Sequence, residues 1–84
     1  MSQSWQFTLN ETSLHFLLAI KARDRQKIIH ALETLAVEPL QKGDFEGKDD
    51  IGRSIQIKAA GSFLISFWPD IFVCELRIIN IEWI

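Results

Sequence analysis

The last thirty residues constrain the fold most, because they consist of three apolar runs separated by two turn sequences. The runs are 55–58, 63–68 and 72–84, and the turns are 59–62 and 68–71. Short apolar runs bounded by glycine or proline are typical of strands joined by hairpins. The sequence therefore predicts a three-stranded antiparallel meander in this part of the chain.

The third run changes its alternation partway along. Its apolar positions are first Cys74, Leu76 and Ile78, and then Ile79, Ile81 and Trp83. A β-bulge would explain this change of phase, and so would burial of both faces. Cys74 is the single cysteine and cannot form an intrachain disulfide, so we expect a small core residue rather than a reactive thiol.

The first half of the chain predicts a strand followed by two helices. Trp5, Phe7 and Leu9 alternate with polar residues, as in a half-buried strand, and Asn10 is suited to cap a helix that begins near Glu11. A second helix, which Asp24 would cap, has its apolar residues on one face and ends at the Glu38-Pro39 step. These apolar residues are Ile28, Ile29, Ala31, Leu32, Leu35 and Ala36.

Residues 40–54 carry three glycines and several acids, which predicts a long solvated connection. The acidic run within it lacks the spacing of a calcium loop. The economical architecture is an α+β domain spanning residues 1–84, with both helices packed on one face of an antiparallel sheet.

Composition favours a protein of the cytoplasm that does not grip nucleic acid over its whole surface. The net charge is −2, and 48% of the residues are hydrophobic. No apolar stretch is long enough for a membrane span, and the start of the chain, residues 1–4, does not resemble a secretory leader. His15 and His30 lack the ligand spacing of a metal site, and no phosphate-binding glycine motif occurs, so neither a metal nor a cofactor is expected.

Two small basic groups are candidate sites for nucleic acid. Lys21, Arg23, Arg25 and Lys27 surround the start of the second helix, where ordinary surface charge is the simpler interpretation. Arg53 and Lys58 flank the polar face of the first meander strand. Arg77 stands two residues after Glu75 on the same side of a strand, and we expect the two to pair.

The chain resembles the RelE/ParE superfamily of toxins from type II toxin–antitoxin systems. The resemblance covers nearly the whole chain and is carried by segments 52–58, 61–67 and 76–81. These segments are similar to the family's strand that leaves the loop, its Gly-x-aromatic hairpin strand and its closing apolar strand. The resemblance implies the toxin fold, a cognate antitoxin as partner, and the ribosome with its mRNA or DNA gyrase as target.

RelE members cut mRNA in the ribosome without a metal, with cations that stabilise the developing negative charge. The resemblance places their basic positions on Gln56, Lys58, Leu64 and Ile84, of which only Lys58 is a cation. Loss of one such contact commonly costs about 10²- to 10³-fold in rate. The sequence therefore leans away from an enzyme.

Three functions stay open. The first is a toxin-superfamily module that binds protein through Trp83, Ile84, Ile81 and Trp68, with an antitoxin helix or added strand as its partner. Trp83 would equally fit as a residue that completes the core. The second is an active endoribonuclease that uses Lys58, Arg53 and Arg77 as catalytic residues, and the third is a structural homo-oligomer, the simplest form of which is a homodimer.

Overall fold

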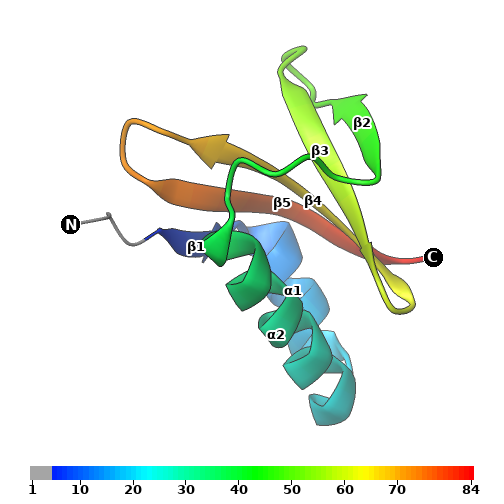
Figure 1. The fold of residues 1–84 in the computed structure, drawn as a ribbon. Helices are drawn as coiled ribbons and strands as arrows, with labels where there is room; N and C mark the ends of the chain where they lie inside the picture. Colours follow the sequence, from blue (N-terminus) through cyan, green and yellow to red (C-terminus); the bar gives the residue numbers. More distant parts are fainter. Residues whose placement is uncertain (1–4) are drawn as a thin grey trace.

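The structure, a computed structural model, describes residues 5–84, so the interpretation of residues 1–4 lies outside the described residues. One strand is followed by two helices and then four strands (Figure 1). The elements are β1 (Gln6–Leu9), α1 (Glu11–Ala19), α2 (Ala22–Val37), β2 (Phe45–Lys48), β3 (Ser54–Ala60), β4 (Phe63–Asp70) and β5 (Glu75–Trp83).

The strands form one mixed sheet in the order β1-β5-β4-β3-β2. The predicted meander is confirmed, because β3, β4 and β5 pair antiparallel in sequence order. The prediction of a wholly antiparallel sheet is wrong, since β1 pairs with β5 in parallel. Parallel neighbours need a long crossover, and here the helices and the next three strands supply it.

Both helices cover one face of the sheet, as predicted, and the core lies between them and the meander (Figure 1). α2 contributes Ile28, Leu32 and Leu35 to this core, and α1 contributes Leu17. The sheet supplies the rest of the buried set, namely Phe63, Ile65, Phe67, Leu76, Ile78 and Ile81.

The helix ends agree with the sequence at two of three positions. Asn10 caps α1 by accepting the Ser13 N–H at 2.9 Å, and Glu38 ends α2. The predicted cap at Asp24 is wrong, because α2 already begins at Ala22 and Asp24 lies in its first turn. Neither described helix is long and apolar enough to cross a membrane.

The connection predicted to be loop contains strand β2, so that prediction is wrong for residues 45–48. β2 shows no clear alternation of its own and depends on β3, where Phe45 pairs with Ile57 and Gly47 with Ile55. A Cβ added to Gly47 would stand 3.5 Å from Ile57 Cδ1, an ordinary contact distance. Pairing with a neighbour, rather than local sequence, creates this strand.

The predicted turn at residues 68–71 is displaced along the chain. β4 continues through Pro69 to Asp70, and β5 begins only at Glu75, which places Cys74 in the turn rather than in a strand. Pro69 is tolerated because the pairing with β3 ends at Phe67, so β4 has a single neighbour there. Cys74 is half-buried and has a φ of 54°, a conformation that this tight connection requires.

The change of phase in β5 is a β-bulge, one of the two predicted explanations. Ser66 pairs with Asn80 and Phe67 with Ile78, which leaves Ile79 as the extra residue. The bulge brings both Ile78 and Ile81 to the helix-covered face, where they are 1% and 2% exposed.

Candidate functional site

The sheet face opposite the helices is here called the open face. Residues paired across an antiparallel ladder share a face, so the register places Ile55, Ile57, Leu64, Ser66, Trp68 and Arg77 on it. Ile55 and Ser66 are each 7% exposed, while Trp68 and Arg77 are half-buried. No described helix covers this face, and it is the natural place to look for a binding site.

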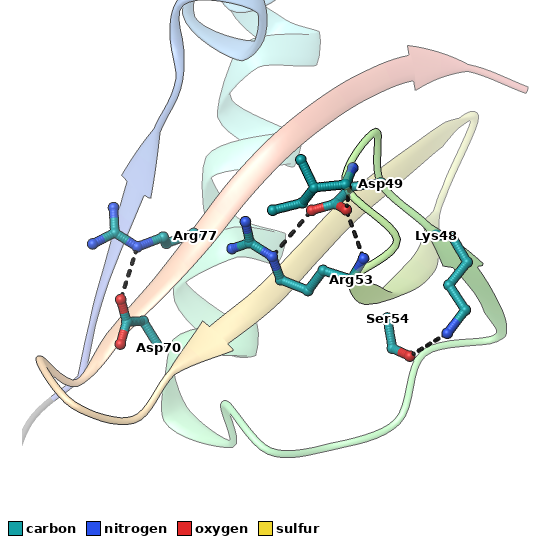
Figure 2. A network of polar contacts seen from close by, with 7 residues as sticks. Lys48, Asp49, Arg53, Ser54, Asp70 and Arg77 are labelled. Atoms are coloured by element: carbon teal, nitrogen blue, oxygen red, sulfur yellow. Dashed lines mark hydrogen bonds and ion pairs between the residues drawn. The ribbon is translucent and has the colours of Figure 1, made fainter.

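Trp68 lies between two arginines on the open face. The guanidinium of Arg53 stacks 4.0 Å from the centroid of the Trp68 ring, and that of Arg77 lies 5.7 Å away. Cation–π contacts of this kind contribute about 0.5–1 kcal/mol where they are exposed. Figure 2 shows both arginine side chains on the side of β4 and β5 that faces away from the helices.

Carboxylates neutralise both arginines. Arg53 Nε lies 3.1 Å from Asp49 Oδ2, and Arg77 Nε lies 3.1 Å from Asp70 Oδ2 (Figure 2). Arg77 Nη2 also lies 3.1 Å from Glu75 Oε1, which confirms the predicted pair. Three carboxylates therefore surround two guanidiniums, and the arrangement offers little net positive charge to a phosphate.

Asp49 also shapes the loop that presents Arg53. Its Oδ1 accepts the backbone N–H of Arg53 at 2.8 Å and that of Ile51 at 3.1 Å. Gly52, with a φ of 83°, closes the turn in a conformation that side chains rarely adopt. The Asp49 carboxylate thus satisfies two backbone donors and positions the guanidinium of Arg53 over Trp68.

A cavity of about 580 Å³ adjoins this arrangement on the open face. Its floor includes Ser66, Trp68 and Ile79, and the start of α1 forms another wall through Asn10 and Thr12. Its charged wall mixes both signs, with Lys48 and Arg53 beside Asp49 and Asp50. Among the described residues, no three His, Cys, Asp or Glu side chains gather as metal ligands in it or elsewhere.

Lys58 lies on the other side of the sheet from Arg53 and Arg77. It pairs in register with the buried Ile65, and its Nζ lies 3.7 Å from Asp44 Oδ1. The three cations predicted as catalytic residues therefore do not form one cluster in this structure. Gln56 shares the face of Lys58, whereas Leu64 lies on the open face, so these positions are also divided.

The basic group at the start of α2 is partly structural. Arg25 donates from Nε to the carbonyl of Leu17 at 2.9 Å and from Nη2 to the carbonyl of Ile20 at 3.0 Å. It thereby satisfies carbonyls at the end of α1 that no helical N–H reaches. His15 and His30 are exposed on the helices, away from the open face.

Trp83 forms a second candidate site at the far end of β5. Its ring lies 4.3 Å from that of Phe63 and 6.2 Å from that of Phe16, and 53% of the residue remains exposed. Ile84 is 74% exposed and donates its N–H to the Ser62 carbonyl at 2.9 Å. We call the set Phe16, Phe63, Trp83 and Ile84 the aromatic end.

The residues predicted to bind a partner do not form one surface. Trp83 and Ile84 lie together at the aromatic end, but Ile81 is 2% exposed and belongs to the core. Trp68 lies on the open face between the two arginines. Beside the aromatic end, a smaller cavity of about 240 Å³ is lined by Phe63, the β3–β4 turn, and Asp24 and Lys27 of α2.

Comparisons with known proteins agree with this architecture. No family model matches the chain, and no curated protein matches its sequence. The structure is similar to the RelBE toxin–antitoxin complex from Mycobacterium tuberculosis, with a TM-score of 0.80 and 13% identity over 98% of this chain and 100% of that one. It is also similar to the archaeal RelE–RelB complex from Pyrococcus horikoshii, with a TM-score of 0.74 and 7% identity over 96% of each chain. The chain has a RelE-like fold, so the predicted resemblance to the RelE/ParE superfamily is confirmed in the fold.

The stack of Arg53 on Trp68 was not predicted from the sequence. Fifteen positions separate the two residues, and they meet because the 49–53 loop folds over the open face. The spacing of Asp49, Gly52 and Arg53 was the available signal, since an aspartate followed by glycine is typical of a tight turn. These residues lie within the segment that was predicted to be a long solvated connection.

Proposed function

We propose that this chain is a RelE-like toxin-superfamily module that acts by binding protein, with an antitoxin as its main partner. The observation that carries the proposal is the exposed Trp83, held in place by two aromatic rings at the end of the sheet. The two similar structures named above are complexes of a RelE toxin with its antitoxin, which supports a partner of this class.

The aromatic end has the composition of an interface anchor. Tryptophan is enriched among residues that dominate binding energy, and burying one against a partner commonly contributes about 2–4 kcal/mol. Phe63 and Phe16 restrict the Trp83 ring before any partner arrives, so little side-chain entropy is lost on binding. The adjacent cavity beside Phe63, whose walls include Asp24 and Lys27, would receive a side chain of the partner.

The open face supports the view that the nuclease chemistry is largely lost. Both guanidiniums are paired with carboxylates, and Lys58 lies on the opposite side of the sheet. To bind either guanidinium, an RNA phosphate would have to compete with Asp49, Asp70 and Glu75. The remaining targets, the ribosome or DNA gyrase in the cytoplasm, would then be engaged by protein contact.

A second candidate function is favoured by one observation. Trp68 with its flanking arginines, next to a cavity of about 580 Å³, could stack a base and contact a phosphate. Primer extension on translated mRNA after induction tests this candidate. New cleavage sites that disappear in Arg53→Gln and Arg77→Gln would establish it, and an unchanged mRNA pattern would exclude it.

Binding to the product of the neighbouring reading frame tests the main proposal. Isothermal titration with the purified chain is expected to show tight binding that Trp83→Ser weakens by about 30-fold or more, the equivalent of about 2 kcal/mol. Trp68→Ser is the matched control and is expected to leave the affinity nearly unchanged. Equal loss in both variants, or no loss in either, would refute the aromatic end as the anchor.

A further inference from the structure

Strand β2 leaves an unpaired edge at one side of the sheet. It is the last strand in the order β1-β5-β4-β3-β2, and no described residue pairs with its outer side (Figure 1). Exposed edges present free N–H and C=O groups and readily accept another strand. Natural edges are usually blocked by lysine, proline or a bulge, and this edge carries a single lysine, Lys48.

The direction of the backbone groups on this edge follows from the hairpin. Asp49 stands opposite Arg53 in the continued register and donates its N–H to the Arg53 carbonyl at 3.0 Å, so its backbone N–H turns toward the strand that leads into β3. Because hydrogen-bonded pairs alternate along an antiparallel ladder, Gly47 and Phe45 turn their polar groups toward β3. Glu46 and Lys48 therefore turn theirs outward.

In one register of pairing, the charged side chains on the β2 edge of one copy stand opposite side chains of opposite charge on a second copy. If two copies pair antiparallel about Gly47, Glu46 of each copy stands opposite Lys48 of the other. Opposite charges directly across a ladder stabilise it, and like charges destabilise it. A pairing centred on Glu46 would place two glutamates opposite each other, and one centred on Lys48 would place two lysines opposite each other.

The same register satisfies the outward backbone groups. Glu46 and Lys48 are the residues whose N–H and C=O point away from β3, and each would form a hydrogen-bonded pair across the two-fold axis, giving about four main-chain bonds. Gly47 at the axis has no side chain to obstruct the approach. The side chains of Glu46 and Lys48 are both exposed, and their hydrogen bonds to other described residues are with neutral groups. Lys48 Nζ bonds Ser54 Oγ at 3.0 Å, and Glu46 Oε1 accepts from Gln56 Nε2 at 3.5 Å.

We propose that this chain forms a homodimer by antiparallel pairing of β2 with β2 of a second copy, centred on Gly47. The two sheets then join into one, with both open faces on the same side, because an isologous pairing about an axis perpendicular to the sheet preserves its faces. The interface is small, and we expect a dissociation constant in the micromolar range. The proposal uses none of the residues of the aromatic end and does not depend on an antitoxin.

Sedimentation velocity over a range of concentrations, from low micromolar to millimolar, tests this dimer with charge-reversed variants. Glu46→Lys and Lys48→Glu each place like charges opposite one another twice, and each is expected to weaken the dimer at least about tenfold. The double variant Glu46→Lys with Lys48→Glu restores the opposite charges and should recover the wild-type constant. Glu33→Lys, an exposed change on α2, is the control for net charge.

Mixing the two single variants gives the most specific result. A chain with two lysines on the edge should pair with a chain that has two glutamates, so a heterodimer is expected where each variant alone is mostly monomeric. Amide exchange at Glu46 and Lys48 in the wild type should also slow as concentration rises. A chain that stays monomeric throughout, a dimer indifferent to these charges, or an edge occupied only by a strand of another protein would each overturn the proposal.

Discussion

The arginine network around Trp68 on the open face and the aromatic end lie toward opposite ends of the β4–β5 ladder and are stabilised in different ways. On the open face, Arg53 and Arg77 are both paired with carboxylates. The Arg53 guanidinium also stacks on the Trp68 ring. At the aromatic end, Trp83 rests on core rings and remains 53% exposed. Arginines that are already paired with carboxylates contribute little free energy to the binding of a ligand. Burial of an exposed aromatic ring that is held on a rigid base contributes much more.

The largest expected effect is at Phe63, the buried member of the aromatic end. Phe63 is 3% exposed and contacts both Phe16 and Trp83, so Phe63→Ala should lower the free energy of unfolding by about 3–5 kcal/mol. Phe72→Ala, in the 71–74 turn where the side chain is 93% exposed, is the matched control and should change it by less than about 0.5 kcal/mol. Urea denaturation measures both, and a similar cost in the two variants would contradict the assignment of Phe63 to the core.

A smaller effect is expected on the open face. Asp49→Ala removes an acceptor from two backbone donors and the partner of Arg53, and should cost about 1–3 kcal/mol. Asp50→Ala, an exposed neighbour in the same loop, should be nearly neutral. If chemical denaturation shows equal stability for these two variants, Asp49 does not organise the loop.

The smallest effect concerns the arginine side chains themselves. Arg77→Gln breaks two ion pairs that are about 40% exposed on the arginine side, and should lower stability by at most about 1 kcal/mol, with a further decrease of the effect at high salt. Thermal unfolding at low and high ionic strength measures this difference. A cost that is large and independent of salt would show that the open face is a packed core rather than a solvated network.

Much of the fold could be predicted because it rests on local patterns. Three patterns of neighbouring residues each predicted an element that the structure contains. They are the alternation of Trp5, Phe7 and Leu9, the apolar face of α2, and the turn at Gly61. The change of phase near Ile79 likewise indicated the bulge. These features depend on periodicity, which short windows of sequence reveal.

The remaining features depend on contacts between distant residues. β2 exists because β3 pairs with it, and β4 continues through Pro69 because one neighbour ends before that residue. The candidate site was predicted only in part for the same reason. The face to which Lys58 points is decided by its register against Ile65, and the partner of Arg53 is chosen by a loop that folds onto Trp68.

One binding measurement that compares the two regions tests whether the aromatic end binds the antitoxin. The protein encoded beside this chain is titrated into wild type, into Trp83→Ser, and into the double variant Arg53→Gln with Arg77→Gln. We expect Trp83→Ser to lose at least about 30-fold in affinity, while the double variant stays within about threefold of wild type. Loss of affinity in the arginine variant with Trp83→Ser unchanged would contradict this expectation and would transfer the function to the open face.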